Sequence, residues 1–133
     1  MQSKYWVDLC ANPFTPEFWS AEEHQSQGFW ELNLNKISLY VTEKICSWDE
    51  WRNELIGKPM FNVNLLDHFL MYKELIPEAW KKIKVFFAGT IYRYFGSDLR
   101  IRFLYWDGFD WQWDFAWVKD IFDSNCHVAL IKI

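Results

Sequence analysis

Aromatic residues constrain this chain more than any other feature of its sequence. Ten Trp, twelve Phe and six Tyr occur among its 133 residues. At roughly 200 Å² each, these side chains amount to about 5,600 Å², on the order of a third of the surface that a domain of this size can bury. The chain therefore needs a large apolar core, which excludes a disordered protein, a repeat array and a small domain that depends on disulfides. The composition alone does not indicate a biochemical activity.

The sequence contains no pattern typical of a membrane span or a secretory signal. No segment approaches eighteen consecutive apolar residues, and residues 1–9 lack the apolar core of a signal peptide. The three cysteines, Cys10, Cys46 and Cys126, form no CxxC pair. In such a chain cysteines are typically reduced core thiols, so we expect a cytoplasmic protein.

The net charge of −4 is distributed unevenly along the chain. Residues 1–80 carry twelve acids and six bases, residues 81–102 carry six bases and one acid, and residues 103–123 carry five acids and one base. The negative total disfavours binding to nucleic acid or to anionic lipid. Whether residues 81–102 form a basic patch depends on how closely the next acidic stretch pairs with them.

Start and stop signals predict three helices in the first half of the chain. These signals are Thr15-Pro16 with Gly28 after Gln27, the capping box Ser47-Trp48-Asp49-Glu50 with Gly57, and Asn64 with Asp67 ahead of Pro77. The third helix is the most amphipathic and places Leu65, Leu66 and Phe69 on one side. One further turn is predicted from Pro77 to Lys82.

Two alternating stretches lie between the first two predicted helices. Trp30-Leu32-Leu34 and Ile37-Leu39-Val41 alternate in opposite phase. A two-residue turn at Asn35-Lys36 would place all six apolar side chains on one face of a β-hairpin. A bulge in a single long strand is the alternative, and we favour the hairpin.

The second half predicts an antiparallel meander with strands at residues 84–94, 99–105, 109–117 and 127–132. Its turns are Gly96-Ser97-Asp98 and Trp106-Asp107-Gly108, with Gly108 left-handed. This loop places Arg100 opposite Asp114 and Arg102 opposite Gln112, and gathers the apolar residues on the reverse face. In this register Asp110 and Asp114 neutralise both arginines, so no basic patch is expected.

Together these elements predict an α+β fold in which a C-terminal antiparallel β-meander of at least four strands packs against N-terminal helices. The chain forms a single domain, with a helix-rich first half at 1–82, the hairpin at 30–41 and the meander at 83–133. The helix at 64–75 and the aromatic meander face form the core. That face carries Phe109, Trp111, Trp113 and Phe115. Gly89 lies in mid-strand and indicates a bulge or a close approach of another group.

No catalytic or metal-binding signature stands out. His24, His68 and His127 and the three cysteines lack the spacing of a zinc site, so we expect no metal and no cofactor. There is no GxSxG motif. Asp110 and Asp114 would lie roughly 13 Å apart on one strand, too far for a glycosidase pair.

Surface aromatics are the candidates for binding. The candidates are five aromatic residues that the predicted core does not use and one acidic residue next to Trp106. They are Trp106, Asp107, Trp48, Trp51, Tyr92 and Tyr94. Exposed Trp and Tyr anchor protein interfaces and also stack on sugar rings. Stacking on nucleic acid would combine Tyr92 and Tyr94 with Lys84 and Arg93, but the net charge opposes it.

A set of short motifs lies between residues 62 and 120. They are Leu75-Ile76-Pro77-Glu78-Ala79-Trp80-Lys81, Gly89-Thr90-Ile91-Tyr92-Arg93, Leu104-Tyr105-Trp106-Asp107-Gly108 and Trp111-Gln112-Trp113. This pattern resembles short uncharacterised bacterial proteins of candidate-phylum genomes. No activity or site residue is attached to that group, so the resemblance implies nothing about function.

The leading hypothesis is a small acidic protein that acts by binding a macromolecular partner, as an accessory or inhibitor-type interaction protein. We expect the partner to be another protein rather than nucleic acid or a membrane, and the sequence leaves homo-oligomers open. The alternative is a small-ligand or carbohydrate-binding module that uses exposed Trp and Tyr. A third hypothesis is an enzyme with a Cys- or Asp-based site, whose thiol version would use Cys126, His127 and His68.

Overall fold

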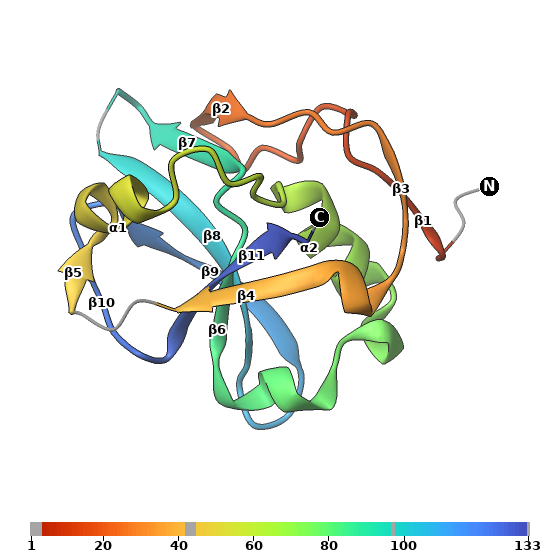
Figure 1. Cartoon of the computed structure of the whole chain (residues 1–133). Helices are drawn as coiled ribbons and strands as arrows, with labels where there is room; N and C mark the ends of the chain where they lie inside the picture. The colour runs from red at the N-terminus through yellow and green to blue at the C-terminus, as the bar shows by residue number, and fades with distance from the viewer. Residues whose placement is uncertain (1–3, 42–44, 97, 133) are drawn as a thin grey trace.

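The computed structural model describes residues 4–41, 45–96 and 98–132 and is dominated by β-structure. Strands make up 41% and helical turns 22%. The predicted α+β arrangement, with N-terminal helices packed on a C-terminal meander, is therefore wrong. The protein is built around a curled, seven-stranded mixed sheet with two short α-helices (Figure 1).

The main sheet combines strands from all parts of the chain. Its order is β2–β7–β8–β6–β11–β4, with β9 also paired to β8. Only the β6–β11 pairing is parallel. The strands are β2 (Trp19–His24), β4 (Ile37–Val41), β6 (Lys84–Phe86), β7 (Thr90–Tyr94), β8 (Leu99–Trp106), β9 (Trp111–Trp117) and β11 (Cys126–Ile131).

The remaining elements are short. Two two-stranded ribbons pair β1 (Trp6–Asp8) with β3 (Phe29–Glu31) and β5 (Cys46–Ser47) with β10 (Ile121–Phe122). The α-helices are α1 (Trp48–Glu54) and α2 (Val63–Met71). Three 3₁₀ turns complete the set, η1 (Leu34–Lys36), η2 (Lys73–Leu75) and η3 (Glu78–Lys82). None of the helices in the described part of the chain has the length and apolar character needed to cross a membrane.

Two predictions for the first half are wrong because long-range pairing replaces the local structure. The predicted helix at 15–27 does not form; its middle residues 19–24 are strand β2, paired with β7. The predicted hairpin at 30–41 does not form, because β3 pairs with β1 and β4 pairs with β11. Its expected turn at Asn35-Lys36 is the 3₁₀ turn η1. Alternation marks these residues as strands without identifying their partners.

The capping signals of the second predicted helix are confirmed. The Ser47 hydroxyl accepts a hydrogen bond from the Glu50 amide at the start of α1. Gly57 has φ +81° beyond its end, a conformation that glycine adopts without strain. Helix α2 forms at the predicted place, although its N-cap is Asn62 rather than Asn64.

The predicted meander is correct only for its central strands. β7, β8 and β9 pair in antiparallel order, but residues 84–94 form two strands, and β11 leaves the meander to pair with β6 and β4. Gly108 has the predicted positive φ. The turn 96–98 includes Ser97, which lies outside the described residues.

The predicted register of β8 and β9 is wrong. Arg100 opposes Trp117 and Arg102 opposes Phe115, rather than Asp114 and Gln112. The loop is longer than expected because the Asp107 amide donates to the carbonyl of Asp110. Phe109, expected in the core, is 91% exposed at this loop.

Each face of the sheet carries its own core. On one face Leu104 packs with α2 residues such as Leu66 and Phe69, so this helix covers the β8 face opposite to the predicted one. On the other face Ile101 and Phe103 pack with the tryptophans of α1. Alternate residues of β8 belong to opposite cores, as the two-residue period of a strand requires.

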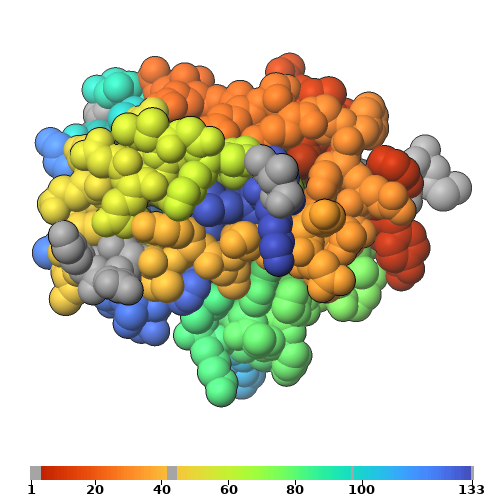
Figure 2. Space-filling view, viewed as in Figure 1, coloured from red at the N-terminus to blue at the C-terminus, as the bar shows by residue number. Residues whose placement is uncertain are grey.

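Residues 59–62 connect strand β11 to the segment that precedes β7. The Gly89 amide donates to the carbonyl of Phe61, and the Phe61 amide donates to the carbonyl of Ala129 in β11. On the face shown in Figure 2 the C-terminal residues (blue) lie beside the segment that follows α1 (yellow-green). An added Cβ at Gly89 would lie 2.6 Å from the carbonyl oxygen of Met60, which confirms the predicted close approach.

We expect Gly89→Ala to destabilise the protein by about 3 kcal/mol or more, because backbone cannot yield as a flexible side chain can. Gly28→Ala is the control: Gly28 has positive φ but nothing within 4 Å of an added Cβ, so only strain of about 1–2 kcal/mol applies. Urea unfolding of both variants measures the difference. Equal losses would contradict the proposed backbone clash.

Candidate functional site

The six residues predicted to bind a partner do not form one site. Trp48 and Trp51 are buried in the core beneath α1, and Tyr92 is buried in the opposite core. The expectation that these three rings reach the surface is therefore wrong. The spacing of Trp48, Trp51 and Leu55 fits one buried helical face.

The other three predicted residues lie at or near the surface. Trp106 is half-buried against Trp111, with the Lys81 ammonium 4.0 Å from the centre of its ring. The carboxylate of Asp107 accepts the backbone amides of Asp110 and Phe109, which lower its pKa. Asp107 thus stabilises its own loop. Tyr94 lies beside Arg100, on the face of the sheet that carries Tyr92.

The most constrained charged group is Arg102, at the centre of this face. Its side chain is 0% exposed, and Nη1 and Nη2 donate to the two carboxylate oxygens of Asp67 at 3.0 and 2.8 Å. The guanidinium also lies 4.1 Å from the ring centre of Trp113 and 5.3 Å from that of Phe14. The predicted neutralisation by Asp110 and Asp114 is wrong, since Asp110 pairs with Lys73.

Tyr92 closes the same region from β7. Its hydroxyl donates to the carbonyl of Phe14 at 2.7 Å, which attaches the N-terminal segment to the sheet. Burial raises the pKa of Tyr92 to about 12, although the nearby Arg102 acts in the opposite direction. The neutral phenol is therefore part of the folded structure.

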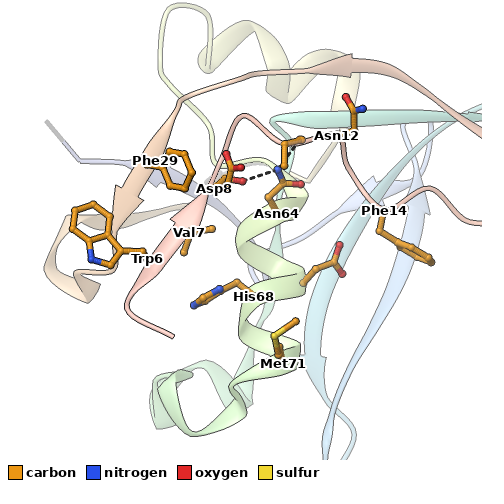
Figure 3. A pocket seen from close by; sticks show the side chains of 11 residues that line it. Trp6, Val7, Asp8, Asn12, Phe14, Phe29, Asn64, His68 and Met71 are labelled. Carbon is orange, nitrogen blue, oxygen red and sulfur yellow. Dashed lines mark hydrogen bonds between the residues drawn. The ribbon is translucent and has the colours of Figure 1, made fainter. Parts of the chain in front are cut away.

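A groove of about 660 Å³ lies over the exposed side of α2. Figure 3 shows Trp6 and Phe29 on one side of the helix and Phe14 on the other, with His68 and Met71 between them. The three rings remain 49%, 70% and 55% exposed, respectively. Exposed aromatic rings from three separate segments thus surround one groove.

The β1–β3 ribbon positions one wall of this groove. Val7 pairs with Trp30 and both pack toward the core, while Asp8 pairs with Phe29. Trp6 and Asp8 share a face because side chains two residues apart on a strand point the same way. The Asn64 side-chain amide of α2 donates to the carbonyls of Asp8 and Ala11, which attaches this segment to the helix (Figure 3).

The groove has an acidic character. Its lining contains no lysine or arginine, and its carboxylates are those of Asp8 and Asp67. Asp67 is paired with Arg102, whereas Asp8 has no ion-pair partner among the described residues. Asp8 accepts hydrogen bonds from the thiol and the amide of Cys10, which lower its pKa. Asp8 therefore presents a negative charge beside the rings.

His68 is also part of this lining, although it is only 2% exposed. Its Nε2 donates to the carbonyl of Lys4 at 2.7 Å, because a carbonyl can only accept. Nδ1 is buried without a hydrogen-bond partner in the described structure. The ring also packs on Tyr72. These contacts favour a role in fixing the N-terminal segment.

The surroundings of Thr90, Cys10 and Cys126 favour structural roles for these potential nucleophiles. Thr90 lies 2.8 Å from Nδ1 of His24, as in a nucleophile–base pair, but Thr90 is fully buried. Burial raises the pKa of Cys126, and the hydrogen bond to Asp8 raises that of Cys10. Both shifts favour the thiol over the reactive thiolate. The thiol enzyme hypothesis therefore gains no support.

No group of three His, Cys, Asp or Glu side chains arranged to hold a metal occurs among the residues that the structure describes. Comparisons with known protein families, curated proteins and solved structures give no match to this chain. The candidate site therefore rests on its own geometry.

Sequence reasoning missed the groove residues Trp6, Phe14, Phe29 and Asp67. The available signal was the alternation at residues 6–9, where Val7 and Leu9 are buried and Trp6 and Asp8 point outward. It predicts a strand but not the helix that lies beside it. Phe14 lies beside Arg102. These two residues are far apart in the sequence, so no local pattern indicates their contact.

Replacing Asp67 with Asn should destabilise the protein by about 3–5 kcal/mol, because a buried guanidinium loses its counter-charge. The control is Asp110→Asn, which breaks the exposed pair with Lys73 and should change stability little. Adding Arg102→Met to Asp67→Asn should restore part of the loss. Denaturant unfolding measures all three; equal effects of the two Asp→Asn changes would contradict this role.

Tyr92 should make stability depend on alkaline pH. The unfolded phenol loses its proton near pH 10, whereas the folded one keeps it to about pH 12. Since the folded state holds the extra proton, the stabilisation that comes from Tyr92 is constant below pH 10 and is lost between pH 10 and pH 12. Unfolding at stepped pH should show a steeper fall for the wild type than for Tyr92→Phe. Parallel curves would show that Tyr92 is not protected.

Proposed function

We propose that this chain is a protein-binding domain whose partner inserts a segment into the groove over α2. The observation that carries this proposal is the exposure of Trp6, Phe14 and Phe29 around a single groove. Aromatic side chains are enriched among the residues that dominate binding energy in protein interfaces. An exposed apolar cluster rimmed by polar groups is typical of such a surface.

Charge indicates the chemistry of the bound segment. The groove lining offers the carboxylate of Asp8 and no lysine or arginine. Asp8 lies across the ribbon from Phe29 and shares a face with Trp6. A lysine or arginine side chain beside Asp8 would contact a carboxylate and two aromatic rings. The carboxylate and the rings each attract a cation. The proposed ligand is therefore a segment with a basic side chain between apolar residues.

Calorimetric titration with a capped Leu-Arg-Leu peptide tests this proposal. We expect saturable binding that weakens about tenfold or more in Trp6→Ala or Phe29→Ala, as for interface anchors. Asp8→Asn should weaken binding of Leu-Arg-Leu but not of Leu-Gln-Leu. Phe109→Ala removes a ring that is 91% exposed and outside the groove, so binding should not change.

Two results of this experiment would contradict the proposal. Binding that is unaffected by both ring truncations would place the ligand elsewhere. Equal binding of Leu-Arg-Leu and Leu-Gln-Leu would remove the basic side chain from the recognised chemistry. Because Trp6 and Phe29 are exposed, their truncation should leave the thermal midpoint nearly unchanged, so loss of binding would not reflect unfolding.

Carbohydrate is a second candidate for the same groove. It is favoured by the combination of exposed rings with Asn12 and Asp8, since rings stack on sugars while amides and carboxylates bind hydroxyl groups. A neutral glycan panel titrated against the wild type and Trp6→Ala separates the two ligands. Binding of a neutral glycan, with no response to Leu-Arg-Leu, would favour the sugar.

A further inference from the structure

Strand β8 carries two arginines in equivalent orientations, and only one has a carboxylate partner. Arg100 and Arg102 are two residues apart and therefore point to the same face of the sheet. Helix α2 supplies Asp67 to Arg102. Among the described residues, no carboxylate lies within ion-pair distance of Arg100. Arg100 therefore places a second guanidinium on this face of the sheet, at a position where α2 supplies no carboxylate.

Aromatic rings hold the Arg100 guanidinium in place. Its central carbon lies 4.3 Å from the ring centre of Phe115, 4.4 Å from that of Tyr94, 5.0 Å from that of Trp19 and 5.9 Å from that of Trp117. Cation–π contacts of this kind orient a guanidinium but accept few of its five N–H donors. The charge is therefore positioned without being neutralised.

The nitrogens of Arg100 differ in their access to solvent. Nε is buried and has no hydrogen-bond partner in the described structure. The terminal nitrogens Nη1 and Nη2 make no hydrogen bond there either, but they are not among the buried atoms. They are therefore the nitrogens of Arg100 that keep some exposure to solvent. Arg102 uses the same two nitrogens to bind both oxygens of Asp67.

A strained aromatic pair borders this site. Phe18 and Phe95 are stacked with their ring centres 4.8 Å apart, and Phe95 also contacts Tyr94. Both have positive φ, +68° and +47°, which is unusual for bulky residues, and both remain exposed. Strain of this kind concentrates at functional sites. Here the strained turns place two apolar rings beside a ring that holds Arg100.

The neighbouring charges indicate the class of anion. Arg93 on β7 pairs with Glu22, and Lys119 after β9 pairs with Asp98. These pairs leave Arg100 as the charge to be matched, which fits one carboxylate. Nucleic acid needs several cations along its backbone, and the described surroundings of Arg100 do not supply them.

We propose that Arg100 binds a single carboxylate, from an acidic side chain of a partner protein, in the bidentate geometry that Asp67 forms with Arg102. Apolar residues beside that acid pack on Phe18 and Phe95. This site is separate from the groove over α2 and does not depend on the function proposed for that groove.

The test is a titration with a capped Phe-Asp-Phe peptide, followed through the nitrogen and proton shifts of the Arg100 Nε–H group. Capped Phe-Asn-Phe, inorganic phosphate and a thymidine oligonucleotide are titrated in parallel. We expect Phe-Asp-Phe alone to bind and to shift this resonance. Calorimetry should show at least about tenfold weaker binding in Arg100→Gln and Arg100→Lys, because lysine lacks the bidentate fork.

Arg52→Gln is the control, because it also removes one positive charge, from an exposed pair with Glu23. It should bind Phe-Asp-Phe as the wild type does. If Arg100→Gln unfolds, Arg100→Lys and the wild-type resonance still decide the question. Equal binding of Phe-Asp-Phe and Phe-Asn-Phe, an unchanged affinity in Arg100→Lys, or tighter binding of phosphate or oligonucleotide would overturn the proposal.

Discussion

The ion pair between Arg102 and Asp67 joins the two parts of the structure on which the candidate site depends. It connects the central strand β8 to helix α2, on the face of the sheet whose core contains Leu104 and Phe69. A fully buried guanidinium is stable only with a nearby counter-charge and hydrogen-bond acceptors. This requirement sets the position of α2 over the sheet. The position of α2 in turn sets where the N-terminal segment can pack, because Asn64 holds the carbonyls of Asp8 and Ala11.

The same pair explains why pairing of opposite charges gave the wrong register for β8 and β9. A register based on charge pairing requires that Arg100 and Arg102 face acids on the neighbouring strand. In the structure their strand partners are Trp117 and Phe115, because aromatic faces attract guanidinium groups and tolerate burial. The carboxylate for Arg102 comes from a helix 35 residues away in the sequence. A cross-strand rule cannot identify such a partner.

Features determined by neighbouring residues could be predicted from the sequence, and features determined by distant residues could not. Ser47 caps its helix, Gly108 adopts positive φ and Gly89 allows a close approach, because each depends on backbone chemistry within a few residues or on the lack of a Cβ. The stretch 15–27 has acceptable helix signals, yet its residues 19–24 form a strand, because β7 offers hydrogen bonds to the backbone and a ring that packs on Trp19. The candidate site depends on contacts of this second kind, so its residues escaped prediction.

The aromatic residues divide according to where the chain can cover them. Most rings of the main sheet and of the α-helices pack in the two cores. Phe14, Phe18, Phe95 and Phe109 lie outside the regular elements and, like Trp6 and Phe29 on the β1–β3 ribbon, remain exposed. Exposed rings promote association when they cluster. Those around the groove over α2 come from three segments, and those beside Arg100 come from strained turns. Hydrophobic burial within the described chain does not account for either cluster. The two proposed partner contacts would each cover one of them.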